Sequence, residues 1–218
     1  NTFLPLAGGA LTGDVTVAAT KTIDGVDISV HAADLKAHMD DNFRLLLEAQ
    51  YAARSVASST NLVIVANTLY ALWFHVTRKR TLDRLAISVA TGDTGKLAYL
   101  GIYNDNGSLS PAGQTLVVDG GTVSVGSTAI VAASITQQLE PGYYWLVFLS
   151  NGTPTVKCSS FSASVSCLGV AAADLLTSNG GYTVAQTYGA LPATFPASPT
   201  LAATTAVPGI VPRVKTND

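Results

Sequence analysis

Short alternating runs of apolar and polar residues, separated by glycine-containing turns, fill the chain from about Ser59 onward. Residues 85–218 hold only 10 of the 26 charged residues and are rich in Val, Thr, Ser, Ala and Gly. Such runs of β-branched and small residues favour strands over helices. The pattern therefore predicts a mainly β chain, with a C-terminal antiparallel β-sandwich of jelly-roll type.

The positions of the expected strands follow from the alternation. They are 62–65, 70–77, 84–90, 96–103, 115–119, 122–125, 129–133, 143–150, 156–161 and 210–214. Turns are expected where Asn-Gly, Gly-Gly or Pro-Gly pairs supply the required backbone freedom, at 104–107, 119–121, 140–142, 151–152 and 179–181. The Ala, Thr and Pro content of residues 172–218 predicts an extended arm that lies over a neighbouring surface.

The first 84 residues carry the other 16 charges and are organised differently. Residues 1–29 place glycine turns between short apolar runs, and Asp24-Gly25 can serve as the turn of a small hairpin. From about His31 to about Arg54 the chain has helix-forming residues and no Gly or Pro. The expected division is a β shaft or collar over 1–29, a helix over 30–56 and the β domain over 57–218.

The predicted helix repeats apolar residues at alternating spacings of three and four, as a coiled-coil seam requires. Its seam is expected to contain Leu35, His38, Asn42, Leu45, Leu46 and Ala49. A lone helix of this kind would expose large apolar residues, among them Phe43 and Leu47, so we expect it to pack against copies of itself. A helix that lies on the β domain is the alternative.

Net charge and hydropathy exclude some functions. The formal net charge is −2, which gives no electrostatic reason to expect a nucleic-acid partner. The longest uncharged run, between Asp174 and Arg213, contains five prolines, so no membrane-spanning helix is expected. No signal peptide is expected at the start. Cys158 and Cys167 are expected to be reduced and buried, a bond across one hairpin being the alternative.

Enzymatic chemistry is not expected. The common motifs of zinc, acyl-transfer and nucleotide chemistry do not occur in the sequence. Most acids of the β domain lie in turn contexts, where Asp bonds the backbone, rather than in the carboxylate pairs that a glycosidase needs. His31 and His38 are expected to be capping or seam residues rather than metal ligands. The sequence therefore predicts no catalytic residue, no metal and no cofactor.

Residues 4–14 read Leu-Pro-Leu-Ala-Gly-Gly-Ala-Leu-Thr-Gly-Asp. They resemble the L-P-L-x-G-G-x-[LM]-T-G element in the shafts and collars of tailed-bacteriophage tail fibres. Residues 23–31 are similar to the linker that often follows in such fibres and leads into a short trimeric coiled coil. Segments 82–87, 100–107, 141–146, 191–196 and 211–214 resemble parts of the C-terminal β-sandwich of these fibres.

The resemblance implies a homotrimeric virion protein that is assembled in the host cytoplasm and joined to other tail or baseplate proteins. Its tip would adhere to a host-surface glycan or outer-surface protein, without nucleic-acid binding or membrane insertion. A capsid head fibre or decoration protein would use the same parts. A carbohydrate-binding module of a secreted or tailspike enzyme is the further alternative. The module of a secreted enzyme would be monomeric and would lack the heptad repeat.

Aromatic, turn and basic residues are the candidate receptor contacts, because sugars stack on rings and bond polar side chains. The candidates are Tyr99, Tyr103 and Tyr144 for stacking, Asn104, Asp105 and Asn106 at a hairpin tip, and Arg78 and Arg80 for an acidic glycan. Core packing of the rings and edge protection by the arginines are the alternative roles. Alternation places Tyr143 and Trp145 on one face and Tyr144 on the other, so at most half of these rings can bind.

Overall fold

A computed structural model describes residues 22–23, 26–27, 59–108, 110–159, 179–203 and 206–217. The chain divides into two units, Asn1–Arg44 and Leu45–Asp218. In the first, strands β1 (Thr22–Ile23) and β2 (Val26–Asp27) pair antiparallel, as the alternation around Asp24-Gly25 predicted. The seam residues Leu35, His38, Asn42, Leu45, Leu46 and Ala49 lie outside the described residues, so the coiled coil stays a prediction.

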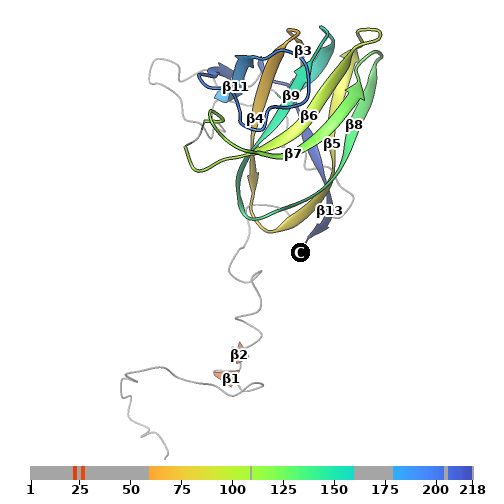
Figure 1. Ribbon diagram of the computed structural model, residues 1–218. Helices are drawn as coiled ribbons and strands as arrows, with labels where there is room; N and C mark the ends of the chain where they lie inside the picture. Colours follow the sequence, from red (N-terminus) through yellow and green to blue (C-terminus); the bar gives the residue numbers. More distant parts are fainter. Residues whose placement is uncertain are drawn as a thin grey trace, which may run out of the picture. The chain divides into compact units, whose positions relative to one another are not determined.

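The described strands of the second unit form two antiparallel sheets (Figure 1). One sheet has the order β13 (Val211–Asn217), β5 (Arg80–Thr91), β10 (Thr155–Ser159) and β3 (Ser59–Val63), and β8 (Ala129–Leu139) pairs with the other edge of β5. The other has the order β12 (Thr200–Ala203), β11 (Asn179–Ala185), β4 (Thr68–Val76), β9 (Gly142–Ser150), β6 (Leu97–Asn104) and β7 (Leu116–Ser124). We call them the five-stranded and the six-stranded sheet.

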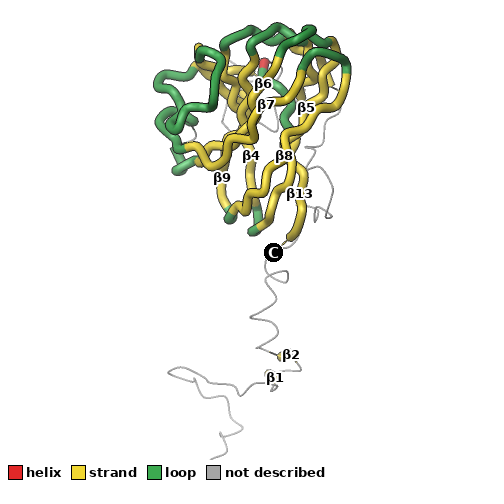
Figure 2. Tube along the Cα trace, turned by 45° about the vertical axis from the view of Figure 1, so that its right-hand side comes forward, coloured by secondary structure: helices red, strands yellow, loops and turns green. Residues whose placement is uncertain are grey.

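One hydrophobic core joins the two sheets. The five-stranded sheet contributes Leu82, Leu85 and Ile87 of β5, and the six-stranded sheet contributes side chains such as Leu100 and Phe148. All five are at most 2% exposed. Because side chains alternate between the faces of a strand, alternate residues of β4, β6 and β9 enter this core. Figure 2 shows that strands make up most of this unit and that many of its loops lie at the strand ends.

The turn predicted at Asp119-Gly120-Gly121 is wrong, because these residues lie inside β7. Opposite them, Tyr99 pairs with Thr122 and Gly101 pairs with Asp119, so β7 has one residue more than β6. This is a β-bulge, and Gly121 adopts the positive φ of 75° that a bulge glycine permits. The two strands predicted on either side are therefore one continuous strand.

The segment expected to be an extended arm contributes strands to the chain's own sheets. Residues 179–181, expected to be a turn, begin β11, which pairs with β4 and β12. β13 pairs with β5 along the five-stranded sheet. The described part of 172–218 is thus integral to the fold. The turn predicted at 151–152 lies between β9 and β10, and of the turn predicted at 140–142 the first two residues lie between β8 and β9 while Gly142 begins β9.

An ion pair ties β13 to β5. Arg213 donates from Nε to Oδ1 of Asp83 over 2.8 Å, and its Nη2 contacts Oδ2 of the same carboxylate. This two-pronged contact holds the pKa of Asp83 below its usual value, chiefly through the hydrogen bond from Arg213. On the neighbouring strand, Cys158 is a free, buried cysteine whose Sγ lies 2.9 Å from Oγ1 of Thr60.

Replacing Gly181 with Ala tests whether Asn179–Ala185 is a sheet strand. A Cβ at Gly181 would lie 2.0 Å from the backbone oxygen of Ala71, so β11 would have to move away from β4. We expect Gly181→Ala to lower the free energy of unfolding by about 1–3 kcal/mol in urea titrations. Gly189→Ala is the control, because no atom lies within 4 Å of its new Cβ. Equal stability of the two variants would contradict the pairing.

Removing the charge of Asp83 should lower stability only where the carboxylate is ionised. Because its folded pKa lies below the unfolded value of about 4, the stabilisation is present above that pH and is lost as pH falls through the folded pKa. We expect Asp83→Asn to be about 1 kcal/mol less stable near pH 7, by urea titration, and to approach the parent as the pH falls through the folded pKa of Asp83.

Glu140→Gln serves as the control for this experiment. Glu140 pairs with Lys79 over 2.7 Å, but the two side chains are 64% and 42% exposed, so little stability is expected from the pair. A deficit in Asp83→Asn that persisted unchanged at low pH would show that the charge of Asp83 is not the stabilising feature.

Candidate functional site

The six-stranded sheet is apolar on both faces. Its outer face, which points away from the shared core, carries a second hydrophobic cluster. The buried members of this cluster are Leu69, Ala71, Trp73, Tyr103, Trp145, Val147, Leu149, Leu191 and Phe195. Strand pairing aligns the members that lie in strands. Trp145 of β9 lies between Trp73 of β4 and Tyr103 of β6. Because such a surface is unfavourable in water, it needs cover from elsewhere in the chain.

Residues 186–199, which we call the covering segment, bury part of this outer face; the loop follows β11 and is blue in Figure 1. The Tyr103 hydroxyl donates to the backbone oxygen of Pro192 over 2.6 Å, and the Phe195 ring meets the Tyr103 ring edge-on at 5.3 Å. The backbone N–H of Leu191 donates to Oδ2 of Asp119 over 3.2 Å. Backbone bonds from Leu116 and Phe195 fix the segment along β7 and the loop before it.

Three rings gather at one end of the same face, and we call them the aromatic patch: Trp73, His75 and Tyr143. Tyr143 lies opposite His75 across the β4–β9 pair, with their ring centroids 4.6 Å apart. Trp73 lies 5.3 Å from Tyr143 and 5.9 Å from His75, and all three ring planes are within 29° of one another. The Tyr143 side chain is 40% exposed, whereas Trp73 is 8% exposed. The patch therefore presents aromatic surface to solvent on a rigid pair of strands.

Polar atoms without partners lie close to the aromatic patch in the sheet. Trp145 is two residues from Tyr143 on the same face, and its Nε1 is buried without a hydrogen-bond partner among the described residues. Asp105 follows the last residue of β6, Asn104, which pairs with Tyr144. Its Oδ2 is likewise buried without a donor among the described residues. Burial, and secondly the charge of Asp105, raise the pKa of Tyr182, whose ring meets Trp145 at 5.5 Å.

The six-stranded sheet has an unusual charge composition. Neither its strands, with the bounds given above, nor the covering segment contains a Lys or Arg. In the described strands every Lys and Arg belongs to the five-stranded sheet: Arg80, Arg84, Lys157, Arg213 and Lys215. The ionisable groups nearest the aromatic patch in the sheet are His75 itself and Asp105. The strands of this sheet and the covering segment therefore offer no Lys or Arg to an anionic ligand, and Arg78 and Lys79 lie in the turn after β4.

The three tyrosines predicted to contact a receptor have different positions. Tyr103 is 0% exposed, and burial, reinforced by the charge of Asp119, raises its pKa. Tyr144 is 8% exposed and packs in the shared core, where its hydroxyl donates to the backbone oxygen of Glu140 over 3.0 Å. Direct receptor contact through these two rings is therefore disfavoured. Tyr99 is half-buried against Tyr188, with ring centroids 5.3 Å apart.

The loop after β6 holds the three predicted hairpin-tip residues. Asn104 and Asn106 are exposed, whereas Asp105 is half-buried. The Oδ1 atom of Asp105 accepts from the backbone of Gly107, and the Oδ1 atom of Asn106 accepts from Nε2 of Gln114 over 2.8 Å. These carbonyl and carboxylate oxygens therefore support the loop, as expected for turn residues. The loop stays a candidate contact through its exposed amides.

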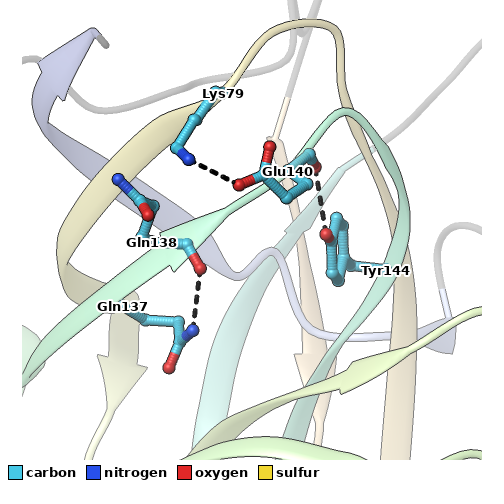
Figure 3. Close-up of polar contacts among 5 residues, drawn as sticks. All are labelled: Lys79, Gln137, Gln138, Glu140 and Tyr144. Atoms are coloured by element: carbon cyan, nitrogen blue, oxygen red, sulfur yellow. Dashed lines mark hydrogen bonds and ion pairs between the residues drawn. The ribbon is translucent and has the colours of Figure 1, made fainter.

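The predicted basic cluster is largely engaged within the protein. Arg80 is only 6% exposed, and its guanidinium donates to the Arg78 backbone oxygen and to Oγ1 of Thr77, both over 3.4 Å. Burial, and secondly the charge of Arg78, lower its pKa. Figure 3 shows Lys79 reaching Glu140 on the adjacent turn, next to Gln137, Gln138 and Tyr144. Arg78 is half-buried, so of the two predicted arginine contacts it is Arg80 that burial keeps from an acidic glycan.

The comparisons with known proteins assign no function to this chain. No model of a known protein family matches the chain, and no curated protein shows significant similarity to it. Within the described ranges, no three His, Cys, Asp or Glu side chains are grouped so that they could hold a metal ion. In the same part of the chain, no helix has the length and apolar character to span a membrane.

Sequence reasoning missed the aromatic patch as a unit. It did place Tyr143 and Trp145 on one face of their strand and Tyr144 on the other, which the two clusters confirm. The exposed ring is Tyr143, however, not Tyr144. The run Tyr-Tyr-Trp-Leu-Val-Phe-Leu has no polar positions to identify the outer face. A usable signal was His75, which alternation places on the same face as Trp73.

Removing the Tyr103 hydroxyl should loosen the covering segment. Tyr103→Phe keeps the ring contact with Phe195 but leaves the carbonyl of Pro192 without its buried donor. We expect a loss of about 1–2 kcal/mol in the free energy of unfolding and faster proteolytic cleavage within 186–199. Tyr99→Phe, at the half-buried ring on the same strand, should change both measurements little. Unaltered cleavage in Tyr103→Phe would mean that other contacts hold the segment.

Proposed function

We propose that this chain is a structural adhesion protein of a bacteriophage tail. In this proposal it is a homotrimeric fibre whose β-sandwich tip attaches the virion to a host-surface receptor, expected to be a glycan. The observation that carries the proposal is the aromatic patch, because an exposed ring held by two stacked neighbours is suited to receptor contact. The resemblance of residues 4–14 to the shaft element of phage tail fibres supports the virion setting.

Two further features support a fibre with a β tip. The described C-terminal part has two antiparallel sheets around one core, which is compatible with a β-sandwich tip. The proposed three-helix seam at 35–49 would join three copies, with Asn42 fixing the register of the helices. Residues 1–29 would then form the shaft or collar that connects to other tail or baseplate proteins. The proposal includes no catalytic step and no cofactor.

The solution mass of the full chain tests the trimer. We expect sedimentation equilibrium of residues 1–218 to give three times the mass of one chain, and a chain beginning at Ala57 to associate more weakly, because it lacks the proposed seam. A monomer at all concentrations for the full chain would contradict the fibre. That result would favour a monomeric carbohydrate-binding module, the alternative that the aromatic patch also fits.

Adhesion is tested on cells. The full chain, labelled with a fluorophore, should bind some strains of a bacterial panel and compete with phage for attachment to those strains. The same chain denatured before mixing is the control for nonspecific adsorption. A trimer that bound none of the strains competent for a phage carrying this chain would contradict a receptor-binding role and favour a capsid fibre or decoration protein.

A further inference from the structure

We infer that the aromatic patch binds a neutral saccharide, with Tyr143 as the main stacking ring. This inference rests on the proposed adhesive function and names the ligand class for it. It differs from the expectation, drawn from Arg78 and Arg80, that an acidic polysaccharide is the ligand.

Exposed aromatic surface favours a ligand with an apolar ring face. Tyr143 is 40% exposed and is held in place by His75 at 4.6 Å and Trp73 at 5.3 Å. Because these neighbours restrict the ring, little side-chain entropy remains to be lost when a ligand stacks on it. The C–H face of a pyranose is an apolar surface of suitable size for one such ring.

A negative charge lies at the same end of the sheet as the aromatic patch. Asp105 lies just beyond the residue that pairs with Tyr144, so it is at the end of the sheet where Tyr143 lies. Its Oδ2 is buried without a donor among the described residues. Because this oxygen is buried, the carboxylate acts on a ligand through its charge rather than through a direct hydrogen bond, and a neutral sugar is not repelled by it. An anionic sugar would instead meet the negative charge of Asp105 at close range.

The charge distribution points to a neutral rather than an acidic sugar. No Lys or Arg lies in the six-stranded sheet or the covering segment. The cations that could attract an anion belong to the other sheet or to turns, and Arg80, Lys79 and Arg213 have acceptors within the protein. Arg78 lies with Lys79 in the turn after β4, outside the sheet. A carboxylate or phosphate ligand at the patch would therefore meet no cation on the six-stranded sheet itself.

The chain carries its own fluorescent reporter for this face. Trp73 and Trp145 are its only tryptophans, and both belong to the outer-face cluster. Titration of the full chain with dextran, galactomannan and chitin oligosaccharides should change the tryptophan fluorescence in a saturable way for at least one of these neutral probes. Polygalacturonate, an anionic polysaccharide, should produce no saturable change at low ionic strength, where electrostatic attraction would be strongest.

Variants of Tyr143 locate the binding. Tyr143→Ser removes the stacking ring and should weaken binding of the neutral probe about tenfold or more. Tyr143→Phe keeps the ring and should bind within about twofold of the parent, which separates loss of stacking from loss of folding. Ile130→Ser, at a 76% exposed side chain of the five-stranded sheet, is the surface control and should bind as the parent does.

Three results would overturn the inference: no response to any neutral probe, a response to polygalacturonate alone, or equal binding by Tyr143→Ser and the parent. Failure here is distinguishable from failure of the proposed function. A trimer that adheres to cells equally well with Tyr143→Ser would keep the adhesive role and remove this site. A full chain that is monomeric and nonadherent, yet binds a neutral probe through Tyr143, would keep the site and remove the fibre.

Discussion

The arrangement of the β domain depends on one constraint: the six-stranded sheet is apolar on both faces and must be covered twice. The five-stranded sheet covers the inner face and forms the shared core. The covering segment covers part of the outer face, anchored where Tyr103 meets Pro192 and Phe195. The covering segment does not bury Tyr143, which is 40% exposed. The candidate site is therefore one part of the outer face that the described chain leaves open.

Strand positions were largely predictable from sequence, whereas the face of each side chain was not. Alternation and turn residues located β4, β6 and β9 to within a few residues. In β9, however, seven of the nine residues are buried. Apolar and polar residues therefore do not alternate along β9, and the sequence does not identify the face that meets solvent. That is why Tyr144, rather than Tyr143, was a predicted contact. Which face receives the covering segment is decided by contacts distant in sequence.

Glycines caused the other differences between expectation and structure. Gly-Gly pairs at 120–121 and 180–181 predicted turns, but both lie within strands at register shifts. At these positions the absence of a side chain serves close approach: a Cβ on Gly120 would lie 2.8 Å from the Leu100 oxygen, and one on Gly181 would lie 2.0 Å from that of Ala71. A glycine needed for a turn and one needed for close packing look the same in sequence. Only pairing distinguishes them.

Charge is divided between the two sheets in a way that links stability with recognition. On the five-stranded sheet, Arg213 and Arg80 take part in structural contacts. Arg213 binds the carboxylate of Asp83, and Arg80 donates to the backbone oxygen of Arg78. A ligand site among them would have to compete with those contacts. The six-stranded sheet contains no Lys or Arg, so recognition on its outer face must rely on ring stacking and hydrogen bonds to neutral groups. Such contacts are individually weak, and a trimer that presents three copies of the patch to one surface would gain affinity through multivalency. The proposed fibre and the proposed neutral ligand therefore support each other physically, because weak single sites become useful for attachment when they are repeated.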